Sequence, residues 1–121
     1  MPSSDQPAPK HPELIRVRQL EFICEQDGPL EKILKTKLSD FFARDRSVRC
    51  ADLAQIKFGE QTSVALCLNT IFGPDRGLAE KIGNIFKTVF NAKCHMDIIF
   101  LNVAQELQIK NVCNAFFPRQ P

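Results

Sequence analysis

Two turn signals, each lying between a strand-like and a helix-like segment, constrain the fold of this chain most. The first is Asp27-Gly28-Pro29 and the second is Gly73-Pro74-Asp75. Aspartate can cap the N-terminus of a helix, and proline is tolerated in its first turn, where the missing N–H would have no partner. Each half of the chain is therefore predicted to pass from a strand through a break into a helix, which indicates an α+β domain.

The segments before and after the first turn signal show the apolar spacing of a strand and of a helix, as expected for such a domain. Val17–Cys24 alternates apolar and polar residues, as a half-buried strand does. The segment Leu30–Ala43 has its apolar residues at helical spacing, which predicts an amphipathic helix lying on a sheet. Those residues are Leu30, Ile33, Leu34, Leu38, Phe41 and Phe42.

The middle of the chain is predicted to form a β-hairpin. Its arms are Val48–Phe58 and Thr62–Thr70, joined around Gly59-Glu60-Gln61. In the first arm, a regular alternation would point Asp52 inward together with the apolar residues. A bulge near Ala51–Leu53 would turn Asp52 away from the core, and we expect one there.

The last third of the chain is the most apolar. After the second turn signal, apolar residues from Leu78 to Phe90 follow helical spacing, and Met96–Leu101 is a strand with two largely apolar faces. Such a strand is either central in a sheet or covered by a further element. That element is a predicted final helix, which starts near Ala104 and ends at the Phe-Phe-Pro of residues 116–118.

This order of elements predicts an α+β, ferredoxin-like fold: a four-stranded antiparallel sheet with βαββαβ order plus a C-terminal helix. Right-handed crossovers would place the first and third strands at the centre and the second at an edge. The proline-rich residues 1–13 are predicted to be a flexible tail. Residues 14–118 are predicted to form a single domain, the size expected for a chain of 121 residues.

Composition excludes several classes of function. The formal net charge of +2 offers no strong field to gather nucleic acid or an anionic membrane surface. No apolar run approaches the roughly 20 residues that span a bilayer. The five cysteines form no CxxC pair, and the first residues lack the apolar core of a signal peptide. We therefore expect a reduced, cytoplasmic protein that binds neither nucleic acid nor membrane.

Four segments together resemble a known family. Val48–Ala54, Val64–Leu68, Met96–Leu101 and Gln105–Phe117 are similar to the C-terminal domain of the bacterial enhanced-serine-sensitivity (SseB) family, over about 14–117. The resemblance implies a small accessory or adaptor domain that acts through protein–protein interaction. Family proteins often carry another domain ahead of this one, where this chain has a short tail. The family offers no catalytic residues or cofactors to carry over.

A protein partner that the sequence does not identify is therefore the leading expectation, and the C-terminal helix is the expected partner surface. Its candidate residues are Gln105, Glu106, Gln108 and Phe117. Self-association through the edge of the second strand would give a homodimer. An immunity or inhibitor protein would belong to the same class of binding proteins.

The main alternative is an amino-acid-sensing module. Asp27, Gly28 and Pro29 lie at the first strand–helix turn, where ACT domains place an Asp-x-Pro-Gly-x-Leu motif, although here the glycine precedes the proline. Catalytic and metal-binding constellations are not expected. Cys94-His95 is too small a set for zinc. An acidic pair of Glu21 and Asp97 on neighbouring strands is expected to be solvated surface charge.

Overall fold

The computed structural model describes residues 20–91 and 93–118, which form an α+β domain with the predicted order of strands and helices. The predicted tail, 1–13, and the start of the predicted domain, 14–19, lie outside the described residues. The elements are β2 (Leu20–Glu25), α2 (Pro29–Asp45), β3 (Val48–Phe58), β4 (Gln61–Thr70), α3 (Arg76–Lys87), β5 (Asp97–Phe100) and α4 (Val103–Ile109).

The strands form one mixed sheet, so the predicted purely antiparallel, ferredoxin-like arrangement is wrong. The four strands follow chain order, β2-β3-β4-β5, and the β4–β5 pair is parallel whereas the other pairs are antiparallel. The second and third strands are therefore central, and the edges belong to β2 and β5. The second strand, β3, lies between β2 and β4, so it is not the sheet edge on which the expected homodimer rested. Self-association itself stays a prediction.

The unequal lengths of β2 and β3 explain this order. The six residues of β2 pair only with the far half of β3, which has 11 residues. Helix α2 has 17 residues and is about 25 Å long at 1.5 Å per residue. It therefore carries the chain past the end of β2 to the start of β3, and β3 can return directly alongside β2 in the antiparallel direction.

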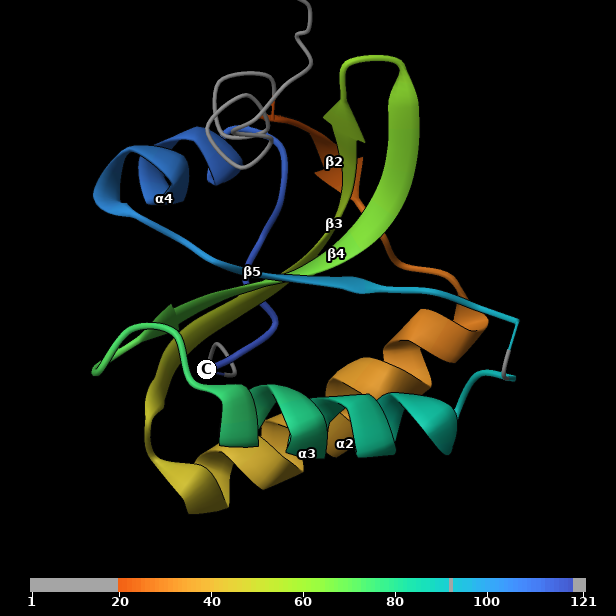
Figure 1. The fold of residues 1–121 in the computed structure, drawn as a ribbon, viewed down its shortest axis with the longest axis vertical. Coiled ribbons are helices and arrows are strands. Elements are labelled where there is room, and N and C mark those ends of the chain that lie inside the picture. The colour runs from red at the N-terminus through yellow and green to blue at the C-terminus, as the bar shows by residue number, and fades with distance from the viewer. Residues whose placement is uncertain (1–19, 92, 119–121) are drawn as a thin grey trace, which may run out of the picture.

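Helices cover both faces of the sheet. Figure 1 shows α2 and α3 side by side beneath one face and α4 over the other. The larger core lies on the α2/α3 face, where Leu34, Leu38 and Phe42 of α2 are buried. A smaller core under α4 contains Phe22, Ala54, Ile56, Ala65, Cys67, Ile109 and Cys113. None of the described helices has the length and apolar composition needed to cross a membrane.

Two details of α2 differ from the sequence prediction. Leu30 and Ile33 are 45% and 48% exposed, so the apolar stripe of the helix is narrower than predicted. Gly28, not Asp27, occupies the N-cap position and makes no side-chain cap, although Pro29 does begin the helix. The equivalent prediction for α3 is confirmed, because Asp75 accepts a hydrogen bond from the Leu78 backbone N–H at 3.2 Å.

The C-terminal segment ends differently from the predicted long helix. Helix α4 begins with a capping box between Asn102 and Gln105 and ends at Ile109. The chain then returns to β3, where Ala51 donates to the Phe117 carbonyl at 2.9 Å and accepts from the Phe116 N–H at 2.9 Å. This pairing is available because β2 leaves the first half of β3 without a neighbour on that side.

The predicted bulge near Ala51–Leu53 is also absent from its expected place. The register between β3 and β4 shifts between Val48 and Cys50 instead. The alternation therefore continues through Asp52, which points into the face covered by α4 and is only 4% exposed. The strand thus brings a carboxylate into the smaller core.

Candidate functional site

Among the described residues, the outer edge of β5 carries backbone groups that no strand pairs with. Leu101 N–H donates to the Leu68 carbonyl at 2.8 Å, so Leu101 directs its backbone toward β4. Backbone direction alternates along a strand, and Ile98 and Phe100 therefore point their N–H and C=O groups away from β4. No described strand pairs with that side of β5, because β5 ends the sheet.

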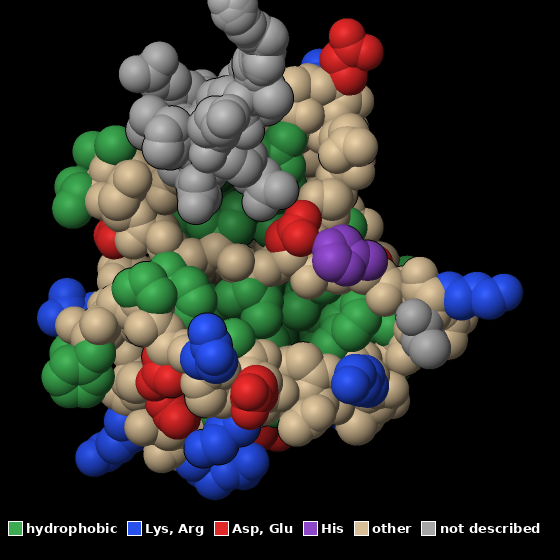
Figure 2. Space-filling view, viewed as in Figure 1, with side chains coloured by type: hydrophobic (Ala, Val, Ile, Leu, Met, Phe, Trp, Pro, Cys, Tyr) green, Lys and Arg blue, Asp and Glu red, His purple; other side chains and the backbone are tan. Residues whose placement is uncertain are grey.

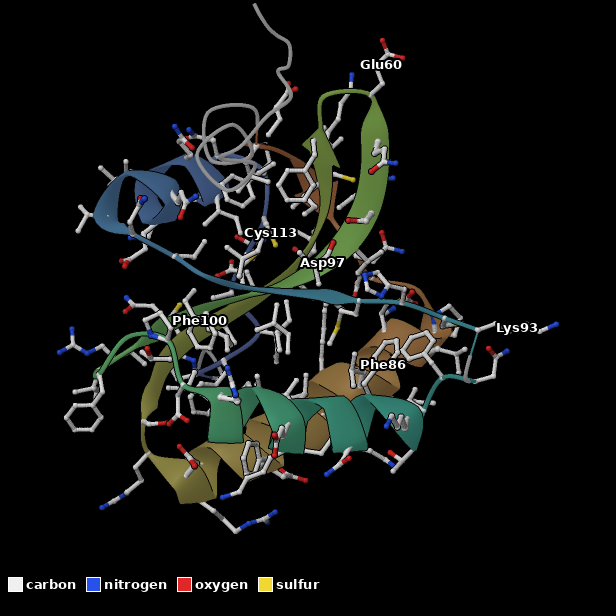
Figure 3. The ribbon with its side chains drawn as sticks, in the orientation of Figure 1. Glu60, Phe86, Lys93, Asp97, Phe100 and Cys113 are labelled. Carbon is white, nitrogen blue, oxygen red and sulfur yellow. The ribbon has the colours of Figure 1, made fainter. Side chains whose placement is uncertain are left out.

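An apolar band runs between this edge and α3. Met96, Ile98 and Phe100 on the α3 face of β5 are only half-buried. On α3 and just after it, the rings of Phe86 and Phe90 stack with their centroids 4.7 Å apart. Figure 2 shows the green band, and Figure 3 places Phe100 and Phe86 toward its two ends. A hollow of about 250 Å³ opens beside Phe86, Phe90 and Met96.

Positive charge gathers next to the apolar band. Residues 76–93 contain four basic side chains, all exposed, against one acidic side chain, Glu80. Figure 2 shows basic side chains below and beside the band, with acidic side chains among those below it, and Figure 3 shows Lys93 reaching outward before β5. The basic residues are Arg76, Lys81, Lys87 and Lys93.

Asp97 joins two polar side chains at the start of β5, but their order does not suit nucleophilic catalysis. The Ser63 hydroxyl donates to Asp97 Oδ2 at 2.8 Å, and His95 Nε2 lies 2.9 Å from Asp97 Oδ1. An activated serine needs the imidazole between the hydroxyl and the carboxylate. Here the carboxylate lies between them, so the histidine has no route to the Ser63 proton.

The predicted ligand turn is tied into the fold by an ion-pair network. Lys35 is 9% exposed, and its Nζ lies 2.9 Å from Asp27 Oδ1 and 3.1 Å from Glu25 Oε2. Burial lowers the pKa of Lys35, but hydrogen bonds to Asp27 and Glu25 outweigh it and leave the pKa raised. The Glu31 carboxylate occupies the space that a Cβ on Gly28 would fill. Amino-acid binding at this turn stays a prediction.

The four residues predicted as a partner surface differ in position and exposure, with three on α4 and one beyond it, and their role stays a prediction. Gln105 is 8% exposed and is held in the capping box, whereas Gln108 is exposed. Glu106 is half-buried at the rim of a pocket. Phe117 lies beyond α4, where its ring packs on Phe42 with the centroids 5.5 Å apart.

The pocket beneath α4 is the site that sequence reasoning missed. It measures about 390 Å³ and lies between the sheet, α4 and the segment after it. Asp52 and Cys113 form its buried base; Figure 3 shows Cys113 between α4 and the sheet. The sequence does contain one signal for this pocket, because the regular alternation of β3 points Asp52 inward. The predicted bulge would turn Asp52 outward and so removes that signal. The lining residues are Cys50, Asp52, Asn69, Leu101, Glu106, Ile109, Lys110, Cys113, Asn114 and Ala115.

The base of this pocket holds a carboxyl group that resists ionisation. Burial raises the pKa of Asp52 to about 6, while the neighbouring Cys113 thiol opposes the shift. Burial also raises the pKa of the Cys113 thiol to about 12 and raises that of the Cys50 thiol. Near neutral pH the thiols are therefore protonated, and the carboxylate carries the charge at the base.

The Asp52→Asn variant should be more stable than the parent chain above pH 6. The pKa of Asp52 is higher folded than unfolded, so stability is lost as pH rises from about 4 through 6. The full shift corresponds to a gain of up to about 3 kcal/mol in the variant. Urea unfolding at a series of pH values tests this, and a constant difference between the two proteins from pH 4 to 8 would contradict it.

The remaining titratable candidates do not assemble into a metal site. Within 20–91 and 93–118, no group of three or more His, Cys, Asp and Glu side chains is placed to hold a metal ion. Cys94 and His95 are both exposed. Glu21 and Asp97 belong to strands at opposite edges of the sheet, so the two carboxylates do not form an acidic pair on neighbouring strands.

Comparisons with known proteins do not add to this geometry. A scan of protein-family models found none that matches, and searches of curated proteins and of solved structures found no significant match. The resemblance to the enhanced-serine-sensitivity family therefore stays a prediction from the residues of the chain.

Proposed function

We propose that this chain is a non-catalytic accessory domain, similar to the enhanced-serine-sensitivity family, that binds an extended segment of a partner protein along the edge of β5. The partner segment has apolar side chains at alternate positions and acidic residues beside them. The observation that carries the proposal is the outer edge of β5, which pairs with no other described strand and lies beside a half-buried apolar band.

Backbone hydrogen bonds would attach the partner segment to β5, and the apolar band would contact its side chains. The N–H and C=O groups of Ile98 and Phe100 are oriented to pair with an added strand. An added strand would direct every second side chain toward the α3 face, where Phe86 and Phe90 are only half-buried. An extended segment with alternating apolar residues matches both features.

Charge favours an acidic partner over a second copy of this chain. Two-fold antiparallel pairing of β5 with itself would place the two α3 helices side by side on one face of the joined sheet. Their exposed Arg76, Lys81 and Lys87 would then approach like charges. A segment bearing Asp or Glu meets the same basic side chains with favourable electrostatics.

The geometry at Ser63, His95 and Asp97 supports a binding role over hydrolysis. The carboxylate separates the hydroxyl from the imidazole, with contacts of 2.8 and 2.9 Å on its two oxygens. These contacts instead fix the start of β5 against β4, which keeps the strand edge in position. The three residues are therefore proposed to order the binding edge.

Titration calorimetry with short synthetic peptides tests the proposal. A peptide of alternating valine and glutamate should bind, whereas a valine–lysine peptide of the same length should not. Reversing two charges, Arg76→Glu with Lys87→Glu, should weaken binding by roughly fivefold or more, since rim charges contribute modestly. The matched control Arg44→Glu changes an exposed charge on α2 and should leave the affinity unchanged.

Three results would refute the proposal. One is equal binding of the glutamate and lysine peptides, and another is an equal loss of affinity in the Arg44→Glu control. The third is the absence of binding together with concentration-dependent dimerisation in light scattering, which would assign the edge to a second copy of the chain.

A further inference from the structure

On the face of the sheet opposite the apolar band lies the 390 Å³ pocket beneath α4. Its base is formed by side chains from separate parts of the chain: Asp52 on β3, Ile109 on α4 and Cys113 beyond it, all at most 6% exposed. The rim carries polar side chains, among them Asn69 and Asn114. At about 30 Å³ for one water molecule, the pocket has the volume of roughly a dozen waters, which is room for a small metabolite.

The charge of the pocket selects for a cation. Asp52 carries negative charge at the base, and Glu106 adds a second carboxylate at the rim. Lys110 also lines the pocket, yet within the described part of the chain no lysine, arginine or histidine nitrogen lies within ion-pair distance of Asp52. Two acids against one base leave an excess of one negative charge.

The neighbours of Asp52 compensate its charge only weakly. The Cys113 thiol beside it is a weak donor, and it is directed at the Leu53 and Asn114 carbonyls, each 3.5 Å away; no described residue donates a side-chain hydrogen bond to Asp52 at normal distance. The like charge of Glu25 on β2 raises the pKa of Asp52 further, whereas the positive charges of Lys110 and Lys35 lower it from a distance. A buried carboxylate without a strong donor is costly, so a ligand that donates charge-assisted hydrogen bonds gains affinity here.

We propose that this pocket binds a small molecule bearing a primary ammonium group, which pairs with Asp52 while the amide side chains of Asn69 and Asn114 contact its polar remainder. An ammonium donates up to three hydrogen bonds to carboxylate oxygens, which the thiols at the base cannot replace. Anions are rejected by Asp52 and Glu106. A metal ion is disfavoured because Cys50 and Cys113 hold their protons under burial.

The site is independent of the proposed peptide edge. It lies on the α4 face, whereas the apolar band beside β5 lies on the α3 face. Ethanolamine is a suitable probe, with acetate and ethylene glycol as anionic and neutral controls. We expect ethanolamine alone to shift the backbone amide resonances of Asn69 and Cys113, with a dissociation constant on the order of millimolar for so small a ligand.

The variant Asp52→Asn should weaken ethanolamine binding at least about tenfold, while the control Asp40→Asn, an exposed carboxylate on α2, should leave it unchanged.

Lowering the pH from about 7.5 to about 4.5 should weaken binding to the parent chain roughly 30-fold, because a carboxyl with a pKa of about 6 is then mostly protonated. Glu106→Gln should retain this pH dependence. Unchanged binding in Asp52→Asn, equal shifts with acetate, or no shifts with ethanolamine would overturn the proposal.

Discussion

Ending the chain after Leu101 should abolish the soluble folded state. The truncation removes Ile109 and Cys113 from the core under α4 and exposes Ile99 and Leu101 of the sheet. It also removes the Phe117 ring from Phe42. Burying one large apolar side chain stabilises a fold by about 1.5–3 kcal/mol. The loss summed over the side chains that are removed or exposed therefore reaches the range of about 5–15 kcal/mol that typically separates folded from unfolded chains.

The soluble yield and the circular dichroism of the truncated chain test this expectation. A chain that ends at Pro118 is the matched control, because it keeps the strand-like pairing of Phe117 with Ala51. That control should be soluble and should unfold cooperatively. A soluble, cooperatively folded chain ending at Leu101 would contradict the account, since α4 would then be an appendage and not a cover of the sheet.

The substitution Phe42→Ala should lower the free energy of unfolding by about 3–5 kcal/mol, the range seen when a buried phenylalanine is truncated. Phe42 is 1% exposed, and its ring lies 5.6 Å from Phe41 and 5.5 Å from Phe117, centroid to centroid. The cavity left by its removal would loosen α2 and the C-terminal segment together.

Phe72→Ala is the matched control for this loss. The same atoms are removed, but Phe72 is 85% exposed in the turn before α3. Its effect on the free energy of unfolding should stay within about 0.5 kcal/mol. Urea denaturation of both variants measures the difference, and comparable losses at the two positions would show that Phe42 does not hold the core together.

The local elements of this fold could be predicted from the sequence because their signals are local. The hairpin of β3 and β4 follows from alternation around Gly59, and the start of α3 follows from Asp75 as its cap. The order of strands in the sheet could not be predicted in this way. It depends on how far α2 carries the chain relative to the length of β2, and periodicity does not encode that distance.

The candidate sites were harder to predict than the elements. The edge of β5 became visible only when the strand order placed β5 last in the sheet. The pocket depends on Asp52 staying inward, whereas the alternation rule predicts a bulge that turns such a carboxylate outward. A local rule that expects apolar residues inside a strand will misplace a carboxylate that lines a pocket.

Hydrogen exchange at single amides of β5 tests the proposed binding edge most directly. The N–H groups of Ile98 and Phe100 face away from β4, whereas the N–H of Ile99 faces it. In the free chain Ile98 and Phe100 should exchange faster than Ile99, and saturation with the valine–glutamate peptide should slow both by at least about tenfold. Ile99 should change little. Protection of Ile98 and Phe100 in the free chain, or no slowing at saturation, would contradict the proposal that β5 is the binding edge.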